Sequence, residues 1–492
     1  MAAEIELKLF FNPADRQLLT EKLNSLEHAE ALPTKQLTNR YFDTPDLQLR
    51  RWDMGLRVRG EGERREQTIK TAGQVVGGIH SRPEYNIDID GDSPLLKLFP
   101  ADIWPENADL DAVQQQLICF FDTDFNRQLW HVYVGNSMVE IALDTGWISA
   151  GEQREAICEL EFELLAGEVS ALLELAHTVA QWLPVRLGKA SKAQRGYRLA
   201  SGARPLTLDA LSYVALEGHH DIHSALQTLL ETCIERWQLL EQAIAQSAEV
   251  PLQCAQYWQR LRSIIRLLKM TLRHVELGDE TYDACFHAIE SRIGFVDDAL
   301  SLAVVIEEQL LARHELAEQF ESMAAARLAQ CDLGGKLQAL QQLPQYGQLQ
   351  LAVVQLLLDL SKGLVILPAR QLKQMADSMQ EASWQQILML MPPDNALSES
   401  EFLAAAKTLD DAILVGFAYG ELYPVASRDS FRAPWRDLAH GIRALAGYAV
   451  LDDMSQATDA QLHDWLCNKR QSLILALDFS RKSAQAMTPY WR

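Results

Sequence analysis

The hydrophobic pattern of the chain changes its period near residue 200, and this change constrains the fold more than any other feature. Before that point charged and apolar residues alternate, as in Glu4–Leu9, Leu56–Arg59, Glu84–Asp90 and Glu159–Leu164. Successive side chains of a β-strand point to opposite faces, so each segment predicts a strand with one charged and one apolar face. We therefore expect a mainly antiparallel β-domain with a few helices, at Pro13–Ser25, Asp109–Leu117 and Val169–Leu183.

Beyond residue 222 the apolar residues recur at helical spacing. The first stripe consists of Ile222, Leu226, Leu229, Leu230, Cys233, Trp237 and Leu240, and similar stripes continue to the C-terminus. Small residues and a proline at Ser201–Pro205 mark the boundary between the two patterns. We expect one domain at 1–202, a linker at 203–217 and an all-α helical-bundle domain at 218–492.

Composition excludes several classes of protein. The chain has 492 residues, 48% of them hydrophobic, which is globular rather than disordered composition. Its formal net charge of −22 predicts neither nucleic acid nor membrane as a partner, because both are polyanionic surfaces. Seven scattered cysteines without a Cys-x-x-Cys pair favour reduced thiols, and no signal peptide is evident, so we expect a cytoplasmic protein.

Several predicted strands carry like charges two residues apart on one face. Glu4 and Glu6 form one such row, Arg57 and Arg59 another, and Glu159–Glu163 a third. One row of this kind is typical of a solvated sheet face, but several are unfavourable unless opposite charges lie between them. A barrel with these faces inward would bring both signs together around a polyanion and a divalent metal. Parity alone also places four further residues on the inward face, namely Arg82, Glu84, Asp88 and Glu163.

The N-terminal half resembles the CYTH domain, whose members are also called triphosphate tunnel metalloenzymes. Glu4-Ile5-Glu6-Leu7-Lys8 matches the Glu-x-Glu-x-Lys signature of that family. The segments that follow it in the family order are Arg40–Thr44, Leu56–Arg59, Thr68–Lys70, Arg127, Ile141–Asp144, Glu159–Glu161 and Lys189–Gly196. The resemblance covers residues 1 to about 200.

This resemblance implies an eight-stranded antiparallel β-barrel with flanking helices that binds triphosphate in its tunnel and requires Mg²⁺ or Mn²⁺. It implies metal ligands at Glu4, Glu6, Asp144, Glu159 and Glu161. It implies substrate-binding cations at Lys8, Arg40, Arg57, Arg59, Lys70, Arg127, Lys189, Lys192 and Arg195. Glu4, Glu6 and Lys8 are the expected catalytic residues, with the Glu4 and Glu6 pair favoured for orienting the attacking water.

The helical half resembles the CHAD domain, because a CYTH domain followed by a helical region of this length is the order found in bacterial CYTH–CHAD inorganic triphosphatases. The family is associated with polyphosphate binding through histidines and arginines. Only part of its two signatures is present, at Arg260, Arg262, Arg266, His440 and Arg443. The resemblance therefore implies polyphosphate or a protein as the partner of this half, while solvated helix faces are an equal alternative for these residues.

Three functions follow from the sequence. The leading hypothesis is metal-dependent hydrolysis of inorganic triphosphate to pyrophosphate and phosphate. The alternatives are a class IV-type adenylate cyclase, which uses the same triphosphate grip, and a non-catalytic triphosphate or polyphosphate sensor. Because every matched site residue precedes residue 200, we also expect residues 1–200 alone to retain catalysis.

Overall fold

The computed structural model describes all residues except 1–2, 77, 203–204, 309, 312–313 and 456–459. The chain forms two compact units: Met1–Pro205 with Gln341–Asp359, and Leu206–Leu340 with Leu360–Arg492. Ala203 and Arg204, which begin the expected linker, lie outside the described residues. The segment from 341 to 359 packs with the first unit, although it falls within the range 218–492 expected for the helical domain.

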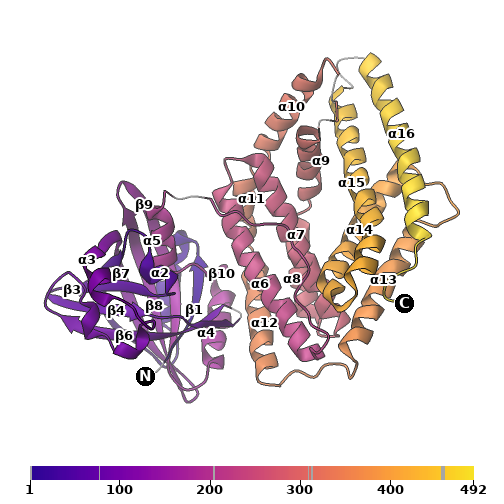
Figure 1. Cartoon of the computed structure of the whole chain (residues 1–492). Coiled ribbons are helices and arrows are strands. Elements are labelled where there is room, and N and C mark those ends of the chain that lie inside the picture. Colours follow the sequence, from indigo (N-terminus) through magenta and orange to yellow (C-terminus); the bar gives the residue numbers. More distant parts are fainter. Residues whose placement is uncertain (1–2, 77, 203–204, 309, 312–313, 456–459) are drawn as a thin grey trace. The chain divides into compact units, whose positions relative to one another are not determined.

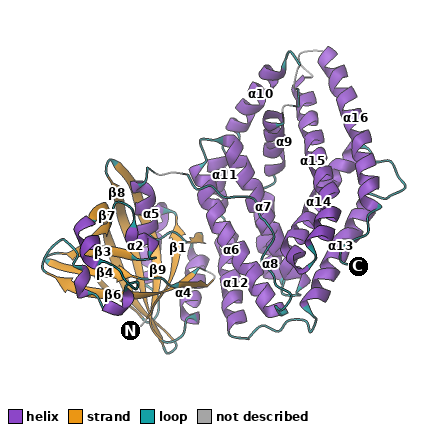
Figure 2. Cartoon of the chain, viewed as in Figure 1, coloured by secondary structure: helices purple, strands orange, loops and turns teal. Residues whose placement is uncertain are grey.

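The first unit is built around a closed antiparallel β-barrel (Figures 1 and 2). Its strands are β1 (Ala3–Phe11), β2 (Ala29–Asp43), β3 (Gly55–Glu61), β4 (Arg64–Lys70), β6 (Ile79–Ile89), β7 (Ile118–Val134), β8 (Ser137–Ala150) and β9 (Gln153–Ala166). The strand order is β1-β9-β8-β7-β2-β3-β4-β6, and pairing of β6 with β1 closes the barrel. Two short strands extend the sheet, β5 (Gln74–Val76) beside β6 and β10 (Val185–Leu187) beside β1. The eight-stranded tunnel expected from the sequence is confirmed.

Strand alternation separates the two faces of the barrel wall. Leu56, Val58 and Ile69 are buried on the outer face, in a core shared with Phe99 and Val113 of the helical segments that cover it. Arg57 and Arg59, which alternate with those apolar residues, face the lumen. The outer core therefore holds the strands in the orientation that directs their charges inward.

Short helices surround the barrel: η1 (Pro13–Asp15), α1 (Arg16–Asn24), α2 (Gln48–Arg51), η2 (Leu96–Leu98), η3 (Ala101–Ile103), α3 (Leu110–Gln116), α4 (Ser170–Trp182) and α5 (Lys192–Ala200). The three helices expected from the sequence correspond to η1 with α1, to α3 and to α4. Asp109 caps α3 by accepting a hydrogen bond from the backbone N–H of Ala112 at 3.0 Å. Ser191 and Gln194 form a capping box at the start of α5. The first unit also contains most of α12 (Pro344–Ser361).

The second unit is all helical (Figure 2). Its helices are α6 (Ile222–Gln246), α7 (Pro251–His274), α8 (Glu280–Arg292), α9 (Val296–Glu307), α10 (Ala317–Gln330), α11 (Leu333–Gln341), α13 (Leu372–Leu390), α14 (Glu399–Tyr419), η4 (Gly420–Leu422), α15 (Val425–Ser455) and α16 (Ala460–Gln485). The apolar stripe predicted for α6 is buried, as Leu226, Cys233 and Trp237 illustrate. Among the described residues, no helix has both the length and the apolar character needed to cross a bilayer.

Candidate active site

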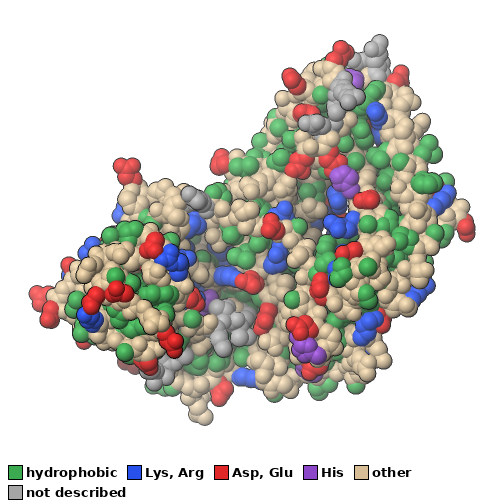
Figure 3. All heavy atoms as spheres, viewed as in Figure 1, with side chains coloured by type: hydrophobic (Ala, Val, Ile, Leu, Met, Phe, Trp, Pro, Cys, Tyr) green, Lys and Arg blue, Asp and Glu red, His purple; other side chains and the backbone are tan. Residues whose placement is uncertain are grey.

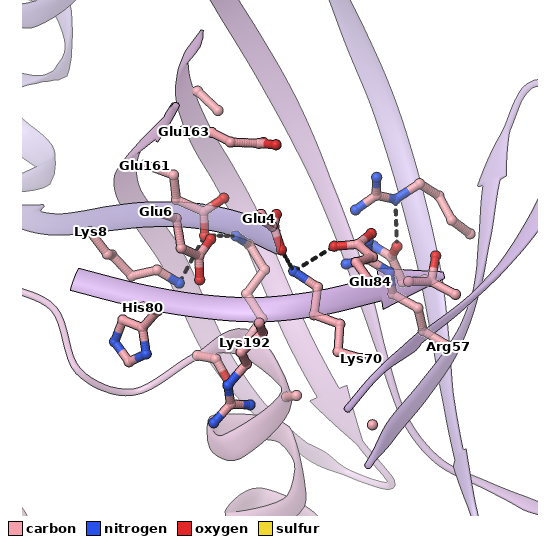
Figure 4. A pocket seen from close by; sticks show the side chains of 18 of the residues that line it. Glu4, Glu6, Lys8, Arg57, Lys70, His80, Glu84, Glu161, Glu163 and Lys192 are labelled. Atoms are coloured by element: carbon pink, nitrogen blue, oxygen red, sulfur yellow. Dashed lines mark hydrogen bonds and ion pairs between the residues drawn. The ribbon is translucent and has the colours of Figure 1, made fainter. Parts of the chain in front are cut away.

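The inward faces of the barrel strands enclose a cavity of about 530 Å³. Its wall is polar and carries charges of both signs, as the close view in Figure 4 shows. The acids are Glu4, Glu6, Glu84, Glu140, Glu161 and Glu163. The basic residues are Lys8, Arg57, Arg59, Lys70, Arg82, Arg127, Lys189 and Lys192, and His80 is the only histidine among the described lining residues. Most of the sequence-predicted site residues therefore lie together.

Three carboxylates from neighbouring strands form a buried cluster, defined here as Asp144 on β8 with Glu159 and Glu161 on β9. The Nζ atom of Lys192 lies 2.6 Å from Asp144, 2.5 Å from Glu159 and 3.1 Å from Glu161. The Nζ atom of Lys8 lies 3.1 Å from Glu159 and 2.8 Å from Glu161. Strand register produces this convergence, because Asp144 pairs with Glu159 across β8 and β9, and Lys8 pairs with Glu161 across β1 and β9.

The surrounding cations keep the buried carboxylate cluster ionised. Burial opposes ionisation of Asp144, but Arg127 and Lys192 outweigh it and hold its pKa below the ordinary value. Arg127 binds Asp144 through two hydrogen bonds, of 2.7 and 2.6 Å, and contacts Glu161 at 2.7 Å. The pKa of Glu161 is likewise lowered, because Lys192, Lys8 and Arg127 together overcome its burial. Charged carboxylates are the form that can ligate a metal ion.

A second group of charges lies across the lumen, on β1, β3, β4 and β6. Lys70 contacts Glu4 and lies 2.8 Å from Glu84, and Arg57 lies 3.2 Å from Glu84 (Figure 4). Burial and the nearby charge of Glu84 raise the pKa of Glu4 to about 8, although Lys70 acts in the opposite direction. Glu84 is held ionised despite its burial, because Arg57 and Lys70 lower its pKa. Two buried acids that share cations in this way differ strongly in their readiness to ionise.

Several groups in the cavity have incomplete pairing. The Nε atoms of Arg57 and Arg82 are buried and have no hydrogen-bond partner among the described residues. Arg59 donates from Nε to Asn39 at 3.0 Å, and no carboxylate of the described residues forms an ion pair with it. Its pKa falls to about 10, because burial and the neighbouring Arg57 and Arg127 disfavour its charge. Buried donors without partners are costly, and an anionic ligand would satisfy them.

Glu6 is the carboxylate of the Glu-x-Glu-x-Lys segment that keeps its oxygens available. It lines the cavity beside Lys8 and Glu161 (Figure 4), and within the described part of the chain nothing hydrogen-bonds to its carboxylate. Each residue of the buried carboxylate cluster offers an oxygen within 4.8 Å of those of the other two. Carboxylate oxygens are the donors that Mg²⁺ and Mn²⁺ prefer, so Glu6 and Glu161, which line the cavity, fit such an ion, whereas Asp144 and Glu159 behind them are paired with Lys192.

Two residues expected on the inward face lie elsewhere. Arg40, expected to hold phosphate, is exposed on the outside of the barrel and lies 3.6 Å from Asp122. The reason is strand alternation, since its neighbours Asn39 and Tyr41 line the cavity instead. Asp88, placed inward by parity alone, is exposed and pairs with Arg64 at 2.9 Å. Both expectations are corrected.

Arg195 lies behind the cavity wall rather than in it. Its Nη1 atom lies 2.9 Å from Glu159 and its Nε atom 2.6 Å from Glu155. Asp144 and Glu159 are also fully buried behind the lining surface. Arg195 therefore orients a member of the buried carboxylate cluster, and in this geometry it does not face the lumen as a substrate-binding cation would.

Several lining residues were not predicted from the sequence, among them His80, Thr68, Asn86, Asn39 and Tyr41. His80, Arg82 and Glu84 occupy alternate positions on β6 and therefore share one face. Extending the strand predicted at Glu84–Asp90 back to residue 80 would have identified His80. The hydroxyl of Thr68 donates a hydrogen bond of 2.7 Å to the side-chain oxygen of Asn86, so the two residues satisfy each other's polar groups in the wall. Uncharged polar residues of this kind have no distinctive sequence signal.

Comparison with known proteins identifies the first unit. Residues 2–197 match the family model of the CYTH domain. This stretch of the chain is a CYTH domain. An inorganic triphosphatase of Haemophilus influenzae is 40% identical over 209 residues, which are 41% of this chain and 56% of that protein. The match thus spans little more than half the length of the relative.

Solved structures similar to parts of the chain are remote in sequence. A Hippeastrum protein, described as a candidate adenylyl cyclase with a dominant triphosphatase activity, is 19% identical with a TM-score of 0.32 and covers 41% of this chain and 97% of its own. The CHAD domain from the plant Ricinus communis is 14% identical with a TM-score of 0.43, and covers 58% of this chain and 98% of its own.

The arginines of the CHAD-like signature contact acids or carbonyls of the second unit. Arg262 lies 2.6 Å from Asp297, and Arg266 lies 2.6 Å from Asp411. Arg260 donates to the backbone carbonyl of Leu208. A hollow where basic side chains and a histidine gather is visible on this unit (Figure 3). The unit contains a cavity of about 930 Å³ lined by residues of both signs, Arg236, Arg260, Glu307, Asp410, Arg436, Asp437, His440 and Arg443 among them.

Proposed function

We propose that the chain hydrolyses inorganic triphosphate to pyrophosphate and phosphate inside the barrel, with Mg²⁺ or Mn²⁺ as cofactor. The observation that carries this proposal is the combination of unsatisfied guanidinium donors with ionised carboxylates in one cavity. Arg57 and Arg82 have buried Nε donors without partners, and Arg59 has no carboxylate partner among the described residues. A short phosphate chain supplies several charged acceptors at once, which suits such a wall. The similarity to an inorganic triphosphatase supports the same substrate.

The proposal divides the lining residues by charge. Phosphate oxygens are bound by the cations of the wall, namely Lys8, Arg57, Arg59, Lys70, Arg82, Arg127, Lys189 and Lys192. The carboxylates that would hold the divalent ion are Glu4, Glu6 and Glu161, which line the cavity, with Asp144 and Glu159 buried behind them. The ion, when bound, neutralises charge that develops on the phosphoryl oxygens. Lys8 and Lys192 line the cavity and also contact the buried carboxylate cluster. Each ammonium group can therefore bind a phosphate oxygen and a carboxylate at the same time.

The reaction needs few groups beyond this wall. The oxygen of a water molecule forms a bond to the terminal phosphorus while the bond from that phosphorus to the bridging oxygen breaks. Pyrophosphate leaves with the bonding electron pair, and the proton of the attacking water passes to a carboxylate. Glu6 is suited to orient that water, because its carboxylate faces the lumen without a partner among the described residues. Cations around the phosphate stabilise the charge that moves to the leaving group.

Phosphate release tests the proposal. Purified full-length protein is incubated with inorganic triphosphate, thiamine triphosphate or ATP, with Mg²⁺, with Mn²⁺ or with EDTA, and the products are separated by chromatography. We expect metal-dependent formation of pyrophosphate and phosphate from inorganic triphosphate, faster than turnover of either organic substrate. Without the metal, activity should be lost.

Other outcomes would select the alternatives. Cyclic AMP and pyrophosphate from ATP would replace hydrolysis by an adenylate cyclase activity. Tight binding of triphosphate without turnover in either metal would mean that the tunnel is a sensor. Binding of polyphosphate or of a protein by the second unit, implied by its resemblance to the CHAD domain, stays a prediction.

A further inference from the structure

One helix of the first unit comes from far along the chain. Residues 341–359, which include most of α12, belong to the same compact unit as the barrel, although the segments that precede and follow them in sequence belong to the helical unit. Its contacts are specific. The side-chain oxygen of Gln350 accepts a hydrogen bond from the backbone N–H of Leu187 at 2.9 Å, and Gln348 donates to the carbonyl of Ala180 at 3.2 Å. Both Gln350 and Leu187 are buried.

The approach of α12 to β10 is too close for a side chain at one position. A Cβ atom on Gly347 would lie 1.8 Å from the carbonyl oxygen of Val185. Only glycine lets the helix backbone come this near to the strand. Gly347 and Gln350 lie three residues apart and therefore on the same face of the helix, so that face is built to fit β10.

The strand that α12 covers, β10, is an edge strand, so one of its sides has no neighbouring strand among the described residues to pair with. On one side β10 pairs with β1, where Gly188 donates its N–H to the carbonyl of Lys8 at 2.8 Å. Alternate backbone groups point to the opposite edge, which is where Leu187 donates to Gln350. A buried N–H without an acceptor is costly, so the glutamine stabilises the position of this strand.

β10 leads directly into the basic wall of the cavity. Lys189 lies two residues after Leu187 and lines the lumen, and Ser191 caps α5, whose first residue is Lys192. The ammonium group of Lys192 contacts all three members of the buried carboxylate cluster. A displacement of β10 would therefore move both lysines, and Lys8 through its backbone contact with Gly188.

We propose that α12 positions the Lys189–Lys192 segment for triphosphate, with Gln350 and Gly347 as positioning residues. The inference rests on the proposed function, because it assigns these lysines to the same substrate. It departs from the expectation that residues 1–200 suffice for catalysis, because a helix from the second half of the chain covers β10.

Single substitutions in the full-length protein test this proposal. Gln350→Met keeps the length of the side chain but removes the acceptor for Leu187. Gln355→Met is the matched control, since Gln355 lies on the same helix and donates to Asp359 at 2.9 Å within α12. Loss of a net hydrogen bond corresponds to a change of about threefold to tenfold. We expect Gln350→Met to raise the KM and the Kd for triphosphate by that factor with kcat within about twofold, and Gln355→Met to change neither.

Hydrogen exchange followed by mass spectrometry supplies a readout that does not need activity. In Gln350→Met the peptide containing residues 183–191 should exchange faster than in the wild type, whereas in Gln355→Met it should not. Gly347→Ala is the second variant, because its added methyl group must push α12 away from Val185. It should raise KM more than Gln350→Met does and should accelerate the same peptide.

The outcomes separate this inference from the proposed function. Unchanged KM, Kd and exchange in Gln350→Met and Gly347→Ala would overturn the positioning role, and so would equal losses in Gln350→Met and Gln355→Met. If the wild type does not hydrolyse triphosphate, the proposed function fails, while Kd and exchange still decide whether α12 positions the lysines. If Gln350→Met does not fold, Gly347→Ala and its KM provide the decision.

Discussion

The tunnel of the first unit and the cavity of the second unit are both lined by arginines and carboxylates, but they differ in exposure to water. In the tunnel, Asp144 and Glu159 have no exposed surface and Lys8 has 5%. In the helical cavity, the side chains of His440 and Arg443 are 62% and 36% exposed. Charges removed from water interact strongly and are costly to leave unpaired, whereas exposed pairs contribute little. The charges named here therefore interact strongly with one another in the first unit and are largely screened by water in the second.

The largest expected effect is that of Glu6→Gln, which keeps the size of the side chain and removes its charge. Because the carboxylate has no partner among the described residues, stability should be unchanged while turnover is lost. We expect kcat to fall by about a hundredfold or more, the usual result of removing one group that acts on the transition state. Phosphate release and the thermal midpoint are the measurements. A rate close to that of the wild type would contradict the role proposed for Glu6 in the cavity of the first unit.

A smaller effect is expected from Arg59→Ala, which removes a buried cation without a carboxylate partner. Charge-assisted hydrogen bonds contribute about 1.5–3 kcal/mol, so KM for triphosphate should rise by roughly tenfold to a hundredfold. Arg40→Ala is the control on the outside of the barrel, and Arg443→Ala is the control in the helical cavity. Steady-state kinetics of the three variants should show the change in Arg59→Ala alone. A similar rise in either control would mean that burial does not decide which arginines act.

The smallest effect concerns an ion pair of the second unit. Arg492 binds Glu381 through two hydrogen bonds, of 3.0 and 2.6 Å, and these lower the pKa of Glu381 from 4.5 to about 2. A lowered pKa in the folded state stabilises the protein above pH 4.5 and loses that contribution as the pH falls towards 2. Because the pair is largely exposed, solvent screens its charges and the contribution is small.

Glu381→Gln should therefore lower the urea midpoint slightly at pH 7, and the difference from the wild type should shrink as the pH falls below 4.5. Urea titrations of both proteins at a series of pH values check this. A difference that grows on acidification would contradict the assigned direction of the pKa shift.

The alternation of charged and apolar residues was sufficient to find most of the site. Glu4, Glu6 and Lys8 occupy alternate positions on β1, and all three line the cavity as expected. Arg40, expected from the family resemblance, lies outside, because β2 carries Asn39, Arg40, Tyr41 and Phe42 in succession and it is Asn39 and Tyr41 that line the cavity. A strand without strict alternation does not reveal which of its residues point inward.

The features that can be predicted from the order of amino acids are local: the strand and helix periods, the boundary near residue 200, and the charged rows that face inward. Those features follow from the geometry of single elements, which repeats every 2 or 3.6 residues. Tertiary folding places Lys8 opposite Glu161 and Asp144 opposite Glu159, since register depends on how the whole barrel closes. It also decided that Gln350 binds Leu187, 163 residues away in the chain. No periodicity encodes such a contact, because it depends on the shapes of two finished surfaces.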